Sequence, residues 1–125
     1  GIWAQMDLKH MRQILWNLLR NAAQAINGQG RIEVALRADD GKAKITIADN
    51  GRGMSEDTQK NIFDPFFTTR SQGTGLGLSI VHRLLEPYGG QIEVTSRQGH
   101  GTVFTLNLVR IEGPKPQTQV AAALA

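Results

Sequence analysis

The chain has 125 residues, of which 40% are hydrophobic and 20% charged, so it can form one folded domain and is not a disordered tail. Fourteen basic and eleven acidic residues leave a net charge of +3, a mild excess that favours an ordinary solvated surface over a nucleic-acid patch. The absence of cysteine excludes disulfides and thiol chemistry, and no stretch is apolar enough to span a bilayer or to act as a secretory signal.

The first predicted element is a helix over residues 7–26, with Asp7 placed to cap it. Apolar residues recur in it every three or four positions, as on the buried side of an amphipathic helix. This predicted stripe consists of Leu8, Met11, Leu15, Leu18, Ala22 and Ile26. Gly28 and Gly30 are expected to end the helix, because glycine readily adopts the left-handed conformation of a helix cap.

Two runs of alternating apolar and polar residues, 31–37 and 42–48, predict a β-hairpin around the turn Asp39-Asp40-Gly41. The residues expected to face inward are Ile32, Val34, Leu36, Ala43, Ile45 and Ile47. A short helix over about 56–62 should follow, with Ser55 as its N-cap.

Residues 63–75 are predicted to form a loop, followed by a second long helix from Leu76 to about Tyr88 that Gly89-Gly90 stops. The runs 91–96 and 102–109 then predict a second antiparallel pair, joined through two glycines.

Antiparallel pairs clustered among helices predict an α+β fold. We expect a two-layer α/β sandwich, in which a mixed, mainly antiparallel sheet carries the helices on one face. One domain should cover residues 1–112. Residues 113–125 contain two prolines and end in small residues, so a disordered tail or linker is expected there.

Asn17 and Asn21 are the first candidate binding residues. They lie four apart on the first helix, in one row with Ile14 and Gln24 beside the apolar stripe. Their side-chain oxygens suit a hydrated magnesium ion and the phosphates that accompany it. Two surface amides would have the same spacing, so the pair by itself leaves both interpretations open.

The segment Asp49-Asn50-Gly51-Arg52-Gly53-Met54 directly follows a predicted strand. A carboxylate in this place can accept a hydrogen bond from an adenine amino group. Gly51 and Gly53 would let the backbone approach a flat ring, on which Met54 would pack. An ordinary loop with an aspartate-capped turn is the alternative.

The segment Gly73-Thr74-Gly75-Leu76-Gly77-Leu78 opens the second long helix and can present backbone N–H groups to phosphate oxygens. It matches neither the dinucleotide fingerprint nor the Walker loop, and a flexible hinge is the alternative. Before it, Phe63, Phe66 and Phe67 suggest a lid or a docking loop. Arg70 would either reach a terminal phosphate or remain a solvated charge.

Together and in this order, these segments resemble the catalytic ATP-binding domain of bacterial two-component sensor histidine kinases, over about residues 1–110. Its superfamily also includes DNA gyrase, heat-shock chaperones and mismatch-repair ATPases. Residues 13–25 resemble the family's N box, 49–54 its first glycine box, 62–70 its F box, 73–81 its second glycine box and 99–106 its last glycine segment. The short lid and the N box are most similar to kinases of the nitrogen-regulation type.

The resemblance implies a Bergerat ATP-binding fold with ATP and Mg²⁺ as ligands. Asp49 would bind the adenine amino group, with Thr102 assisting through water. Asn17 and Asn21 would hold the metal and the phosphates, and Arg70 and Asn17 would be the catalytic residues. The other implied nucleotide contacts are Gly51, Gly53, Met54, Thr69, Gly73, Thr74, Gly75, Leu76, Gly77 and Leu78. Gln24 stands where many relatives have a basic residue, so no phosphate contact is expected there.

Asn17 bears on the reaction that the resemblance implies. ATP-hydrolysing and serine-kinase relatives carry a glutamate in this place as a base, and an amide cannot accept a proton at neutral pH. A histidine nucleophile needs less help, because neutral imidazole already has a lone pair. The resemblance thus implies in-line transfer of the γ-phosphoryl group to a histidine. A GHKL ATPase or serine/threonine kinase-like module, or a degenerate docking module, is the alternative.

His10, His82 and His100 lack the family's acceptor setting, in which an acidic residue follows the histidine and a proline comes shortly after. They are expected to be surface or structural residues. The acceptor would lie on a dimerisation and histidine-phosphotransfer domain absent from this chain, with a response regulator receiver domain as an indirect partner. We expect no nucleic acid, no direct membrane contact, a cytoplasmic location and a monomeric fragment.

Overall fold

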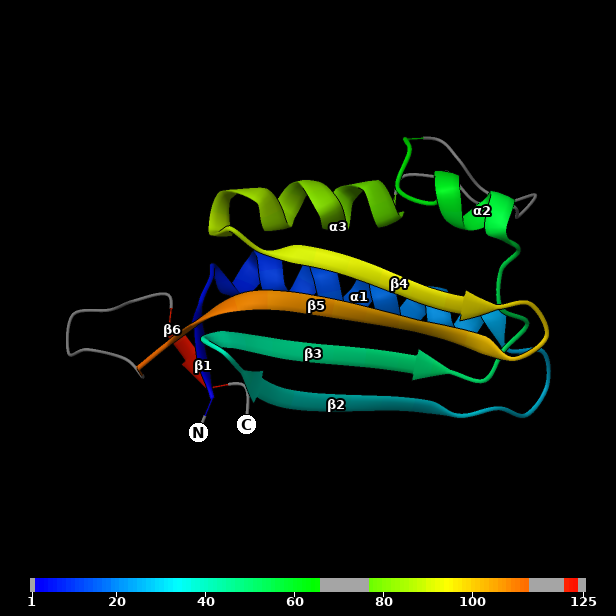
Figure 1. Ribbon diagram of the computed structural model, residues 1–125, viewed down its shortest axis with the longest axis horizontal. Helices are drawn as coiled ribbons and strands as arrows, with labels where there is room; N and C mark the ends of the chain where they lie inside the picture. Colours follow the sequence, from blue (N-terminus) through cyan, green and yellow to red (C-terminus); the bar gives the residue numbers. More distant parts are fainter. Residues whose placement is uncertain (1, 66–76, 113–120, 124–125) are drawn as a thin grey trace.

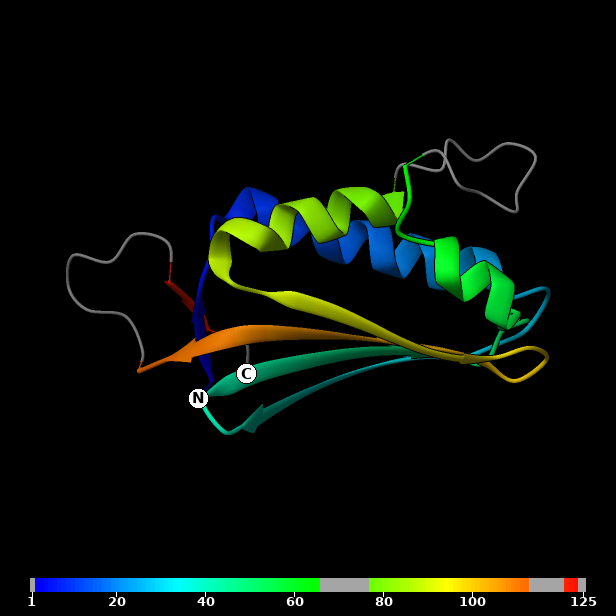
Figure 2. The same ribbon diagram turned by 45° about the horizontal axis from the view of Figure 1, so that its top comes forward.

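Two layers make up the molecule, and Figures 1 and 2 show two long helices lying over one face of a sheet. The computed structural model describes residues 2–65, 77–112 and 121–123. The helices are α1 (Leu8–Ala25), α2 (Glu56–Asn61) and α3 (Gly77–Leu85), and a 3₁₀ turn, η1 (Glu86–Tyr88), continues α3. The predicted α+β sandwich is confirmed.

The sheet has six strands. They are β1 (Trp3–Gln5), β2 (Ile32–Asp39), β3 (Lys42–Asp49), β4 (Gln91–Arg97), β5 (Gly101–Ile111) and β6 (Ala121–Ala123). Their order is β2-β3-β5-β1-β6, with β4 also paired to β5, and every pairing in the described part is antiparallel. β5 is the central strand, because it pairs with β3 along one edge and with β4 and then β1 along the other.

Helix α1 begins as predicted, since the Asp7 side chain accepts a hydrogen bond of 2.8 Å from the backbone N–H of Lys9. Its buried side differs from the predicted stripe: Ile14 is fully buried, whereas Leu8 is 62% exposed. The reason is that α1 packs against α3 as well as the sheet, which turns its buried side toward α3. The predicted left-handed cap is wrong, because the helix ends at an extended Ile26 (ψ 127°).

Three further predictions concern the turn between β2 and β3, the start of α2 and the end of α3. Asp40 and Gly41 have φ angles of 44° and 75°, as a two-residue turn between β2 and β3 requires. Ser55 caps α2 by accepting the N–H of Thr58 at 3.2 Å. α3 is shorter than predicted, because Pro87 lacks the N–H that another α-helical turn would need.

Strands β1 and β6 were not predicted. Each has three residues, too few to show an alternating pattern, and they pair with each other. β6 lies within residues 113–125, the predicted tail or linker, so at least 121–123 have regular structure. Residues 113–120, 124 and 125 lie outside the described part, and the boundary at 112 stays a prediction.

The core lies between the two layers. Its fully buried large side chains are Phe104, Ile14, Leu18, Ile47, Leu85, Leu106 and Val81. Burying such a side chain contributes roughly 1.5–3 kcal/mol to stability. Val34 pairs with the buried Ile47 and so lies on the predicted inward face, yet it is 59% exposed because β2 is an edge strand. None of the described helices combines the length and the apolar composition that crossing a membrane would need.

Candidate functional site

Three predicted site residues, Asp49, Gly77 and Thr102, lie toward one end of the sandwich. There α1 ends, β3 ends at Asp49, β5 begins at Gly101 and α3 begins at Gly77 (Figure 1). Because α1 and α3 run in opposite directions, the C-terminal half of α1 lies on the same side as the start of α3.

A row of three polar side chains crosses the sheet at this end. Asp49 on β3 pairs with Thr102 on β5, which in turn pairs with Ser96 on β4. Directly opposite residues of antiparallel strands share one face of the sheet. The next row on this face consists of Ile47, Phe104 and Val94 and belongs to the core. The polar row therefore faces the helix layer, with Asp49 only 7% and Thr102 only 4% exposed.

Asp49 has one satisfied and one unsatisfied carboxylate oxygen. Its Oδ1 accepts the backbone N–H of Gly51 at 2.9 Å, which orients the group. Its Oδ2 is buried and has no hydrogen-bond partner in the described part. A buried acceptor without a donor is costly. This oxygen is therefore suited to an N–H donor from a ligand.

Ser96 connects the row to the segment after β3. Its Oγ accepts the N–H of Met54 at 2.9 Å, donates to the carbonyl of Gly101 at 3.0 Å, and lies 2.7 Å from Oγ1 of Thr102. Gln59 on α2 reinforces the connection, since its Nε2 donates to the carbonyls of both Met54 and Ser96 at 3.1 Å.

Backbone contacts hold the segment from Asp49 to Met54. The N–H of Arg52 donates to the carbonyl of Ala25 at 2.9 Å. A Cβ at Gly51 would overlap that carbonyl, and a Cβ at Gly53, which has a φ of 66°, would overlap the carbonyl of Arg97. The structure thus gives these two glycines a packing reason that the sequence did not reveal. Whether their backbone also approaches a ligand ring stays a prediction.

Asn17 and Asn21 lie one turn apart on α1, and both are half-buried. Oδ1 of Asn17 accepts from the exposed Gln13 at 3.3 Å, while its buried Nδ2 has no partner in the described part. Asn21 also makes a polar interaction. Their predicted phosphate and metal contacts stay a prediction.

The rest of the predicted site lies outside the described residues: Phe66, Phe67, Thr69, Arg70, Gly73, Thr74, Gly75 and Leu76. Gly77 begins α3, and a Cβ there would meet nothing within 4 Å. Leu78 and Phe63 are half-buried and pack against the core.

The three histidines have different surroundings. Nδ1 of His10 lies 2.7 Å from the hydroxyl of Tyr88, which suits the predicted structural role. His82 is exposed on α3 and lies 3.5 Å from a carboxylate oxygen of Glu86. His100 is exposed in the turn between β4 and β5.

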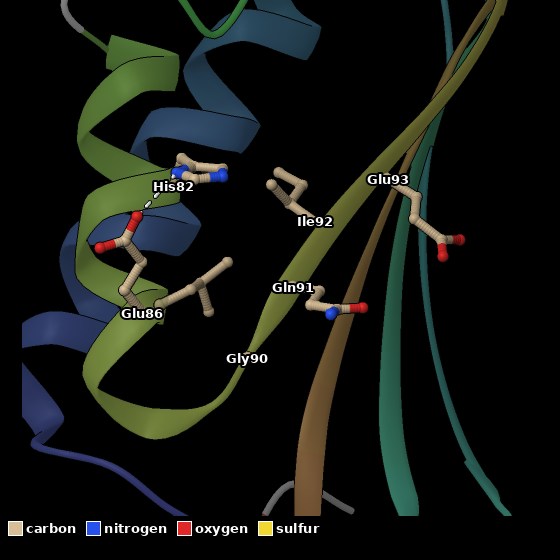
Figure 3. A pocket seen from close by; sticks show the side chains of 7 residues that line it. His82, Glu86, Gly90, Gln91, Ile92 and Glu93 are labelled. Atoms are coloured by element: carbon tan, nitrogen blue, oxygen red, sulfur yellow. Dashed lines mark ion pairs between the residues drawn. The ribbon is translucent and has the colours of Figure 1, made fainter.

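Two of the pockets formed by the described residues lie near these elements, and neither of the two is lined by Asp49. One, of about 260 Å³, lies between α3 and the edge of β4, and Figure 3 shows His82 and Ile92 on its two sides. The other, of about 410 Å³, is lined by Met54, Ser96 and the first turn of α2 and adjoins the polar row.

Sequence reasoning missed Ser96 and Gln59. A signal for Ser96 was present: it continues the inward positions of Ile92 and Val94, where a hydroxyl must find a partner. No local pattern distinguished Gln59, because its partners lie 5 and 37 residues away in the chain.

Residues 6–112 match the family model described as "Histidine kinase-, DNA gyrase B-, and HSP90-like ATPase". Among curated proteins, the chain is 44% identical over 114 residues to the sensor histidine kinase ZraS of Escherichia coli (strain K12), which covers 90% of this chain and 24% of the relative. It is 38% identical over 130 residues to the nitrogen regulation protein NtrY of Azorhizobium caulinodans. This match covers 98% of this chain and 17% of the relative. The chain thus spans about a quarter or less of these relatives.

Solved structures show the same architecture. The catalytic domain of the histidine kinase ThkA superposes with a TM-score of 0.75 at 34% identity, covering 85% of this chain and 70% of that chain. The mycobacterial sensor histidine kinase MprB gives a TM-score of 0.75 at 31% identity. This superposition covers 83% of this chain and 72% of that chain.

Proposed function

Because the chain belongs to the family of histidine kinase-, DNA gyrase B- and HSP90-like ATPases, we propose that it binds Mg-ATP and presents the γ-phosphate to a histidine on another domain. The observation that carries this proposal is the buried Oδ2 of Asp49, which has no hydrogen-bond partner among the described residues. An adenine amino group can donate a hydrogen bond to this oxygen, and a hydrogen bond to a charged acceptor is stronger than a neutral one.

The described residues fit the base of an adenine nucleotide. Asp49 is oriented by Gly51, and Thr102 lies beside it on the same face of the sheet. Met54 is half-buried and held through Ser96 and Gln59, so that it can pack on a flat ring. The site is thus partly apolar, with a few oriented polar groups, as a nucleotide-binding site requires.

Asn17 and Asn21 would supply oxygens to a magnesium ion and the phosphates, and amide oxygens are ligands that Mg²⁺ accepts. Gln13 is exposed and can turn away to release the Asn17 oxygen. When bound, the ion would neutralise charge on the phosphates. We also assign Arg70 to the γ-phosphate, and Thr69 and the glycines at 73, 75 and 77 to the remaining phosphate contacts.

The proposed reaction is in-line transfer, in which the bond from the γ-phosphorus to the β–γ bridging oxygen breaks as a bond to a histidine nitrogen forms. The amide at position 17 cannot act as a base, which favours a nucleophile that already has a lone pair. The acceptor would belong to another domain of a cytoplasmic kinase, and a receiver domain would take the phosphoryl group afterwards. The domain's contribution is positioning and charge neutralisation.

Calorimetric titration with a non-hydrolysable ATP analogue, with and without magnesium, tests the proposal. Asp49→Asn keeps the shape but replaces the charged oxygen, so binding should weaken by about tenfold to a hundredfold. Asp40→Asn makes the same change in the exposed hairpin turn and should leave affinity unchanged. Absence of wild-type binding at millimolar ligand would leave only a degenerate docking module.

A further inference from the structure

We propose that Ser96 is a positioning residue that sets the base specificity of the site through the hydroxyl of Thr102. This inference rests on the proposed binding of an adenine nucleotide. The inference concerns the direction in which the hydroxyl proton of Thr102 points within the polar row of Asp49, Thr102 and Ser96.

The direction of that proton follows from the number of donors and acceptors. A serine hydroxyl has one proton and two lone pairs. The proton of Ser96 goes to the carbonyl of Gly101 at 3.0 Å, because a carbonyl can only accept. The backbone N–H of Met54 can only donate, so it occupies one lone pair of Ser96 at 2.9 Å.

The third contact is thereby determined. Oγ of Ser96 and Oγ1 of Thr102 lie 2.7 Å apart, and either atom taken alone could be the donor. Since Ser96 has already used its proton, the hydroxyl of Thr102 must donate to it. The Thr102 oxygen can then offer only lone pairs to a ligand.

Asp49 and Thr102 therefore present acceptors side by side. They are cross-strand partners on one face, where opposite Cβ atoms lie about 4.5–5.5 Å apart. Oδ2 of Asp49, which has no partner within the described part of the chain, is also an acceptor. Two acceptors in direct contact suit the 6-amino group of adenine and oppose a purine with a 6-oxo group. Without Ser96, the Thr102 proton is free to turn toward the ligand and reverse this polarity.

The test compares the affinities of ATP and inosine triphosphate, which differ at the 6-position of the base. Wild type should prefer ATP. Ser96→Ala should lower the ratio of the two affinities by about three- to tenfold, the effect of one hydrogen bond. Ser96→Thr keeps a hydroxyl in the same place and should restore the ratio. Thermal midpoints of all variants show whether they remain folded.

A double-mutant cycle separates positioning from general support. In a Thr102→Val background no hydroxyl is left to orient, so adding Ser96→Ala should not change the ratio further. The inference would be overturned if Ser96→Ala weakened the binding of both nucleotides equally. It would also be overturned if Ser96→Ala changed the affinity ratio by the same factor in wild type and in the Thr102→Val background. Wild type that binds ATP but does not prefer it to inosine triphosphate would also overturn it. Wild type that binds neither nucleotide would overturn the proposed function itself.

Discussion

The hydroxyl of Tyr88 lies 2.7 Å from Nδ1 of His10 and joins the turn after α3 to the first turns of α1. The same oxygen accepts the backbone N–H of Asp7 at 3.2 Å, and the two rings meet edge to face at 5.8 Å. These contacts fix the two long helices to each other at the end of the sandwich opposite Asp49.

Tyr88→Phe should therefore destabilise the domain without affecting nucleotide affinity. It removes the hydroxyl that serves both partners while keeping the ring, and a loss of about 1–2 kcal/mol in the free energy of unfolding is expected. Urea denaturation measures the loss, and calorimetry measures affinity in the folded protein. A change in affinity comparable to that of Asp49→Asn would contradict a purely structural role.

Gly53→Ala should be more damaging than Gly28→Ala. Both glycines have positive φ, 66° and 82°, so both substitutions carry the left-handed strain of about 1–2 kcal/mol. Only at Gly53 would the added Cβ also overlap a backbone carbonyl, that of Arg97, whereas the space at Gly28 is open. Urea midpoints of the two variants should differ, and equal midpoints would mean that the packing reason for Gly53 is wrong.

Ile14→Ala and Leu8→Ala test the buried side of α1. Ile14 is fully buried, so its truncation should cost about 2–5 kcal/mol, whereas the exposed Leu8 should cost within about 0.5 kcal/mol. Both variants keep a good helix former at the position. If chemical denaturation showed a larger loss of stability for Leu8→Ala than for Ile14→Ala, the buried side predicted from periodicity would be the correct one.

The domain by itself should bind ATP and not phosphorylate itself. His10 is engaged with Tyr88, and neither His82 nor His100 has the sequence setting of an acceptor. Incubation with γ-labelled ATP should leave the protein unlabelled under alkaline conditions that preserve phosphohistidine. Stable label that disappears in one of the variants His10→Gln, His82→Gln or His100→Gln would identify an acceptor within this chain.

Local signals predicted much of this fold. Asp7 and Ser55 were identified as caps, and the hairpin turn was placed at Asp39-Asp40-Gly41, because each of these features depends on backbone geometry within a few residues. The turn itself is one residue shorter, since Asp39 belongs to β2. The predicted end of α3 was too late, although Pro87 was visible in the sequence. The strands β1 and β6 could not be predicted, because three residues form a strand only when a partner strand is beside them.

The candidate site divides in the same way. The sequence by itself placed Asp49 at the end of a strand, although it predicted Asp49 just after the strand and the structure makes it the last residue of β3. It also determined that Asn17 and Asn21 share a helix face, because that relation is set by the chain's own periodicity. Only the tertiary structure decided that Thr102 and Ser96 lie in one row with Asp49 and that Gly53 packs against Arg97. It also decided that one oxygen of Asp49 is buried with no donor among the described residues. The physical reason is that register between strands and contact between distant backbones arise only when β3, β5 and β4 pair.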